Sequence, residues 1–179
     1  ATPSASFLLR MKSISEGGSA EQIPAELTAA SPGDPAMGEA FRGTYTYLLS
    51  IRKPVIAAVN GFAMGGGFML VERTDLRVAV PEAVFEVSEA KRWLLGGYNH
   101  GHLANVPFPI AMEMALGFRF TAERFHQVGF LNRIAPQAEL IPTAIKMAEH
   151  MLTLPPAARV NTVHMMRLMR PEPSDAHND

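Results

Sequence analysis

Apolar residues recur at helical spacing over much of the chain. This spacing predicts helices over residues 36–51, 110–116, 122–128, 140–152 and 157–169. The segment 140–152 has the clearest apolar stripe, and Pro142 falls in its first turn, where a missing backbone N–H costs little. The second half of the chain is therefore expected to be mostly helical.

Two short runs of apolar, mainly β-branched residues differ from this pattern. Residues 55–59 form the first run, which ends at Asn60-Gly61, and residues 76–80 form the second, which ends at Pro81. Such runs are typical of strands that are buried on both faces. Because strands come early and helices late, we expect an α/β fold with a helical C-terminal part.

The expected organisation is a core over residues 1–135 followed by a helical region over 136–179. Residues 15–38 are rich in Gly, Ser, Pro and Ala and are expected to form a flexible loop in the core. The tail PEPSDAHND is expected to be disordered. The chain begins with Ala1 rather than Met, so we expect it to be processed or a fragment.

Composition narrows the possible functions. A chain of 179 residues is long enough for one domain with a hydrophobic core. A formal net charge of −1 argues against nucleic-acid binding, and the absence of cysteine excludes thiolate nucleophiles and zinc–thiolate sites. No apolar run reaches the ~18 residues of a membrane span. We expect a cytoplasmic protein without a nucleic-acid or membrane partner.

Three consecutive glycines, Gly65 to Gly67, lie between the first strand and a helix predicted from about Phe68. Glycines at a helix start let the backbone approach a ligand closely, and the first N–H groups of the helix point outward without partners. This arrangement suits an anion or a developing oxyanion. A tight turn with close helix–strand packing would use the same glycines, so the triplet alone supports both interpretations.

The residues around the glycines carry a family resemblance. The stretch KPVIAAVNGFAMGGGF, the following TDLRVA and the pair Phe85 and Glu89 resemble the signature of the crotonase (enoyl-CoA hydratase/isomerase) superfamily. The later segments AER and VGFLNRI resemble further parts of it, so the resemblance covers residues 53–153 with little interruption. It implies a spiral of ββα units, shortened here at both ends, that acts on coenzyme A thioesters without another cofactor.

The resemblance also implies which residues form the site. In the family, two backbone N–H groups stabilise the enolate of the thioester, and these positions correspond to Gly66 and, in the segment LLRMKS, to Leu9. That segment matches the family's first oxyanion loop at Lys12 but lacks its glycine and aspartate. The residues expected to line the bound substrate are Gly65, Gly67, Met69 and Gly101.

Proton transfer is implied for a single carboxylate. Hydratases of the family use two glutamates, and Met69 occupies the position of the first, whereas Glu89 occupies the position of the second. A thioether cannot exchange a proton, so Glu89 is the expected catalytic residue. From its sequence context alone, Glu89 could also be a solvated or helix-capping carboxylate ahead of Lys91 and Arg92.

Two histidines, His100 and His102, follow in the glycine-containing segment GGYNHGH. They could serve as a replacement base or as a metal pair, but no carboxylate at ligand spacing supports a metal site. We expect them to be exposed loop histidines, with no metal in the protein.

The sequence leaves two functions open. The first is an acyl-CoA enzyme that isomerises its substrate, or hydrates or cleaves it with one carboxylate. The second is a non-catalytic member that binds coenzyme A esters or a partner, which Met69 and the altered first oxyanion loop would favour. In either case the resemblance implies a homotrimer or hexamer, assembled through the C-terminal helices.

Overall fold

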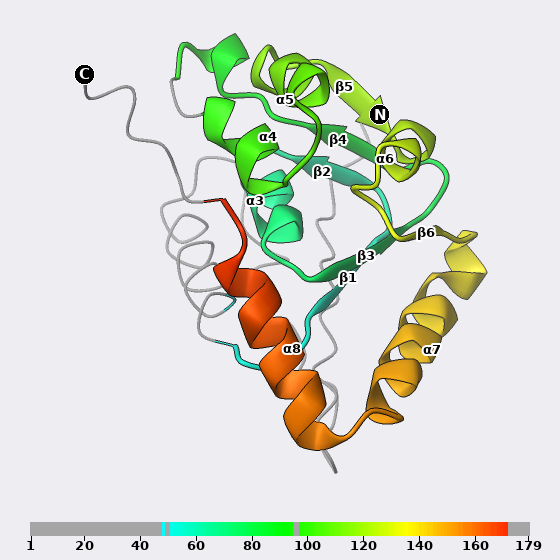
Figure 1. Ribbon diagram of the computed structural model, residues 1–179. Helices are drawn as coiled ribbons and strands as arrows, with labels where there is room; N and C mark the ends of the chain where they lie inside the picture. Colours follow the sequence, from blue (N-terminus) through cyan, green and yellow to red (C-terminus); the bar gives the residue numbers. More distant parts are fainter. Residues whose placement is uncertain (1–47, 49–50, 95–96, 172–179) are drawn as a thin grey trace, which may run out of the picture.

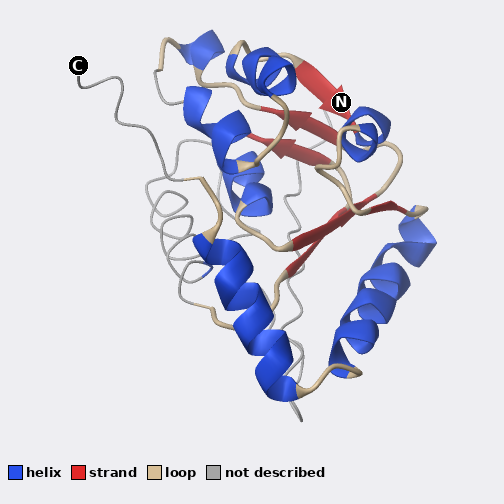
Figure 2. Cartoon of the chain, viewed as in Figure 1, coloured by secondary structure: helices blue, strands red, loops and turns tan. Residues whose placement is uncertain are grey.

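The computed structural model describes residue 48, residues 51–94 and residues 97–171. This part of the chain contains two three-stranded sheets with helices around them (Figures 1 and 2). The first sheet is parallel and has the order β1 (Ile56–Val59), β3 (Leu76–Ala79), β6 (Arg133–Ile134). The second has the order β2 (Phe62–Met64), β4 (Val84–Glu86), β5 (Arg119–Thr121), with β5 antiparallel to β4.

The strands follow one another as a repeated unit. β1 and β2 are separated only by Asn60-Gly61, and after α3 (Gly66–Glu72) the chain adds β3 parallel to β1 and β4 parallel to β2. β3 therefore extends the sheet that begins with β1, and β4 extends the sheet that begins with β2. This repetition confirms the α/β spiral of ββα units that the resemblance implies.

Seven further helical segments follow the first repeat in the described residues. The first six are the short 3₁₀ helices Ala90–Arg92 and Gln137–Glu139, together with α4 (Tyr98–Leu103), α5 (Phe108–Ala115), α6 (Ala122–Gln127) and α7 (Leu140–Leu152). The last described helix is α8 (Pro156–Leu168), and α7 and α8 lie together at the end of the molecule opposite α5 (Figure 1). The expected helical C-terminal part is confirmed.

Most predicted elements agree with the structure, with one correction. The strands at 55–59 and 76–80 and the helices at 110–116, 122–128, 140–152 and 157–169 are confirmed to within two residues. Strands do not stop early, however, because β5 and β6 lie in the second half of the chain. The helix expected over 36–51 falls mostly outside the described residues, as do Leu9, the loop at 15–38 and nearly all of the tail.

The core between the sheets and helices is built around four phenylalanines. Phe68 of α3 stacks on Phe130 with ring centroids 5.3 Å apart, and Phe125 lies 5.0 Å from Phe85 of β4. All four side chains are almost completely buried. Each contributes about 1.5–3 kcal/mol to folding by leaving water. They fix α3 and β4 relative to each other, and these are the elements that carry Gly66 and lead to Glu89.

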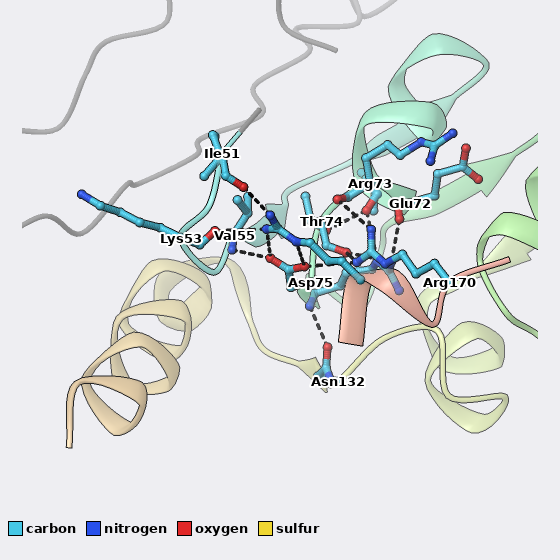
Figure 3. Close-up of polar contacts among 12 residues, drawn as sticks. Ile51, Lys53, Val55, Glu72, Arg73, Thr74, Asp75, Asn132 and Arg170 are labelled. Carbon is cyan, nitrogen blue, oxygen red and sulfur yellow. Dashed lines mark hydrogen bonds and ion pairs between the residues drawn. The ribbon is translucent and has the colours of Figure 1, made fainter. Parts of the chain in front are cut away.

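Arginine side chains secure the C-terminal end of α3 and the start of β3. Arg77 donates hydrogen bonds to the carbonyl oxygens of Val71 and Glu72 at 3.0 and 2.8 Å, so it satisfies helix-end acceptors that have no partner within the helix. Figure 3 shows the neighbouring network, in which Asp75 accepts the Val55 N–H and pairs with Arg167 and Arg170 of the α8 region. These contacts attach α8 to the ends of β1 and β3.

Candidate active site

The glycine turn begins at Gly65, which caps α3 with a φ of +50° and a ψ of −122°. That backbone conformation strongly favours glycine because a Cβ atom would clash there. The Gly65 N–H donates to the carbonyl oxygen of Glu86 at 3.0 Å. Gly66 is the first residue of the helix, so its N–H has no acceptor within the helix, and Gly67 is buried beside it.

The same turn lies against the segment that carries Glu89. Met64 of β2 pairs with Glu86 of β4, and a Cβ built on Gly65 would lie 3.3 Å from the Ser88 hydroxyl oxygen. Ser88, the residue before Glu89, therefore lies against the glycine turn. Parallel pairing of β2 with β4 is what brings together these two motifs, which are separated by more than twenty residues of sequence.

Most of the Glu89 side chain is shielded from solvent, with 17% of it exposed. It immediately precedes the 3₁₀ helix Ala90–Arg92, but its side chain forms no capping hydrogen bond. Lys91 pairs instead with Glu86, at 3.1 Å. Glu89 therefore does not cap this helix, although its sequence context allowed that role. Its carboxylate faces a histidine instead.

That histidine is His100, and the expectation that it is an exposed loop residue was wrong. His100 lies in α4 and is only 6% exposed. Its Nδ1 lies 2.8 Å from Oε1 of Glu72, and its Nε2 lies 3.4 Å from Oε1 of Glu89. Its ring also packs against that of Phe68 in a T-shaped arrangement, with centroids 6.0 Å apart. For His102, the structure describes only its position in α4.

Two glycines allow α4 to bring His100 this close. A Cβ on Gly97 would lie 3.3 Å from Cβ of Glu89, so the chain approaches Glu89 directly where α4 begins. A Cβ on Gly101 would lie 2.4 Å from Ala111 of α5, which is closer than any real contact. Gly101 is thus buried against α5. The close packing of these two helices is enough to explain why a glycine occupies this position. Its role in substrate binding stays a prediction.

Glu72 is the member of this cluster that the sequence reading missed. It is the last residue of α3, three residues after Met69 and thus on the same face of the helix, and is only 2% exposed. Its Oε2 has no hydrogen-bond partner among the described residues. The available signal was a glutamate at the end of the otherwise apolar helix sequence GGFMLV, because such a carboxylate is rarely buried without a partner.

Burial and neighbouring charges shift the pKa values of these three side chains in opposite directions. Burial alone would lower the pKa of His100, but its contacts with Glu72 and Glu89 raise that pKa to about 9. The contact with His100 lowers the pKa of Glu89 against the opposing effect of burial. Burial raises the pKa of Glu72, opposed by the imidazole. At neutral pH the result is a cationic imidazole in contact with an ionised Glu89.

The other expected site residues have defined places. Gly65, Gly66 and Met69 are partly buried at the start of α3, and Gly67 is fully buried. Within residues 48, 51–94 and 97–171, no cluster of three or more His, Cys, Asp and Glu side chains could hold a metal ion. None of the helices described in these ranges is long and apolar enough to cross a membrane.

Comparisons with known proteins match this chain to one protein family. The model of the family described as enoyl-CoA hydratase/isomerase matches residues 24–177. Carnitinyl-CoA dehydratase from Escherichia coli K12 is 35% identical over 141 residues, which cover 74% of this chain and 53% of that protein. The chain therefore spans about half the length of the curated relatives it matches.

Solved structures of enoyl-CoA and carnitinyl-CoA hydratases are also similar to this chain. Enoyl-CoA hydratase from Mycobacterium tuberculosis H37Rv superposes with a TM-score of 0.59 at 38% identity, over 64% of this chain and 47% of that one. Carnitinyl-CoA hydratase from Mycobacterium avium gives a TM-score of 0.60 at 32% identity, over 65% of this chain and 46% of that one.

Proposed function

The chain belongs to the enoyl-CoA hydratase/isomerase (crotonase) family, and on that premise we propose that it transforms acyl-CoA thioesters through an enolate. The observation that carries the proposal is the position of Glu89 beside the glycine turn. A thioester oxygen that accepts the Gly66 N–H would place the α-carbon of the acyl group in the neighbourhood of the Glu89 carboxylate. Leu9 would supply the second N–H donor.

In this mechanism the protein supplies two functions. The Gly66 N–H group, with the start of α3 behind it, stabilises the negative charge that develops on the thioester oxygen. The Glu89 carboxylate removes a proton from the substrate carbon and returns it to a second carbon or to a leaving group. Gly65, Gly67 and Met69 would line the acyl group, and Gly101 would support the wall formed by α4.

Met69 determines which reactions are favoured. Hydration requires a water molecule to be held and deprotonated, and the thioether at this position can do neither. Shifting a double bond requires only that one base move a proton between two carbons. We therefore place isomerisation first, followed by a lyase or hydration step that uses one carboxylate.

Met69 also supports a second candidate, a family member that binds coenzyme A esters or a partner without turnover. The two candidates share the binding site and differ in chemistry. They are separated by whether a bound thioester exchanges its α-protons.

Binding is tested with acetoacetyl-CoA, whose enolate resembles the proposed intermediate. At a concentration near 100 times Kd it should stabilise the protein by about 2.7 kcal/mol and raise Tm by several degrees. Free coenzyme A is the matched control and should give a smaller increase, because it lacks the carbonyl that Gly66 binds. Equal shifts with both compounds, or none with either at millimolar concentration, would count against the proposed thioester site.

We also propose a trimer or hexamer as the working assembly. In and just after α8, the side chains of four apolar residues are between 58% and 75% exposed: Met165, Met166, Leu168 and Met169. Apolar surface of this kind on one helix is a common contact between subunits. Light scattering should therefore give three or six times the chain mass of 19.5 kDa. A chain that stays monomeric at micromolar concentration would rule this assembly out.

A further inference from the structure

We propose that His100 is the positioning residue of the Glu89 base. Glu72 holds its imidazole at Nδ1, and the imidazole in turn holds the Glu89 carboxylate at Nε2 in one orientation and in its ionised form. This assignment deepens the proposed function and rests on it, because it presumes that Glu89 is the group that exchanges the substrate proton.

The first support is geometric. The three side chains come from three separate parts of the fold: Glu72 from the end of α3, Glu89 from the segment after β4, and His100 from α4. The two contacts of 2.8 and 3.4 Å use opposite nitrogens of one ring, so the imidazole bridges the carboxylates. Orientation of one ring nitrogen by a partner at the other is a common way to fix the state of a histidine.

The second support is the unsatisfied polar atoms. Oε2 of Glu72 and Oε2 of Glu89 are both buried, and neither has a hydrogen-bond partner among the described residues. A buried carboxylate with one unpaired oxygen costs stability, and an apolar residue of similar size would suit this part of α3 better. The Glu72 carboxylate is thus explained by its contact with His100. In Glu89, Oε1 faces the imidazole and Oε2 is left to exchange a proton.

The third support is the surrounding charge. On the α3 side of His100 lies Glu72, whose pKa is raised by burial, while His100, Arg73 and Arg77 favour its ionised form against that burial. On the other side lies Glu89. α5 packs against α4 at Gly101, and its only titratable residue, Glu113, forms no ion pair with His100 in the described structure. The imidazole is therefore balanced by two carboxylates, which favour its cationic form.

The contact with the cationic His100 keeps Glu89 ionised at neutral pH, so that it can act as a base. A cation in contact with its carboxylate favours the ionised form, which can accept a proton from the substrate but cannot donate one first. The activity that depends on Glu89 should then persist below pH 4.5, the ordinary pKa of a glutamate, because the pKa of Glu89 is lowered. Removal of the imidazole should move that acidic limit upward.

Carbon-13 NMR of the side-chain carboxyl of Glu89 tests this assignment without any turnover. In the full chain we expect Glu89 to titrate below 4.5, and in His100→Phe to bind its proton at least about tenfold more tightly. The matched control is His126→Phe, because His126 is exposed on α6 and forms no ion pair with Glu89 among the described residues. An unchanged Glu89 titration in folded His100→Phe would overturn the proposal.

Glu72→Gln provides an independent test if His100→Phe does not fold. The amide keeps the size of the side chain and an oxygen that can accept from Nδ1, but it removes the negative charge. Nitrogen-15 NMR should show His100 titrating near pH 9 in the parent and clearly lower in Glu72→Gln. Identical titrations in the two proteins would contradict the arrangement.

Kinetics distinguish a failure of this assignment from a failure of the proposed function. If the parent turns over an enoyl-CoA, His100→Phe should lower kcat about tenfold with little change in KM and should move the acidic limit of the pH profile upward. A residue with only a packing role would leave the pH profile in place. A parent that binds acetoacetyl-CoA but exchanges no α-proton would refute the proposed function, whereas the NMR titrations would still decide the state of Glu89.

Discussion

Replacing Met69 with glutamate is expected to increase the hydration of crotonyl-CoA by about 10²-fold or more, because a positioned acid or base is typically worth 10²–10⁴-fold. Met69 is partly buried on α3, two residues after the glycine turn and three before Glu72. A carboxylate there could hold and activate water together with Glu89. The cationic His100 nearby would offset repulsion among the carboxylates. The loss of enoyl absorbance on addition of the variant measures the gain.

The matched control is Met69→Gln, which offers hydrogen bonds to water but no proton transfer. The gain should be present with glutamate and absent with glutamine, and double-bond isomerisation should change little in either, since it requires no water. An equal gain in both variants would mean that Met69 limits water binding rather than proton transfer. No gain in a glutamate variant that still binds acetoacetyl-CoA would show that the water site is lost for another reason.

Replacing Glu89 with glutamine is expected to cause the largest loss, about 10²–10⁴-fold of any isomerase or hydratase rate. The amide keeps the shape of the side chain, so acetoacetyl-CoA should bind nearly as well as before. It cannot take up the substrate proton, and neither Met69 nor the Gly66 N–H can replace it in that role. The matched control is Glu82→Gln, because Glu82 is exposed in the turn before β4 and should leave the rate unchanged.

The larger elements of the fold could be predicted because their patterns are local. The helix α7 has thirteen residues, enough for an apolar stripe to repeat over three turns. β1 and β3 were recognisable from continuous apolar runs that end at clear turn residues. β2, β4, β5 and β6 were missed because they contain only two or three residues each. At that length an alternating pattern cannot be distinguished from chance, and pairing with distant strands decides the structure.

The site was predictable where it rests on contiguous motifs and not where it rests on packing. Gly66 and Glu89 were found because each lies in a characteristic stretch of sequence. His100 was misjudged because its immediate neighbours are small or polar, and nothing local indicates burial. Its environment comes from Glu72 and Glu89, which are 28 and 11 residues away. The cause lies in tertiary structure: Gly97 and Gly101 let α4 approach closely enough to bury the ring.

The most direct measurement of the central claim is exchange of the α-protons of butyryl-CoA in D₂O, followed by mass spectrometry or NMR. This saturated thioester cannot be hydrated or isomerised, so exchange reports only enolate formation and proton transfer. The proposed mechanism predicts deuterium incorporation by the parent chain and at least about 10²-fold slower incorporation by Glu89→Gln. A parent that binds the thioester without exchanging its protons, or a Glu89→Gln variant that exchanges them at the parent rate, would contradict it.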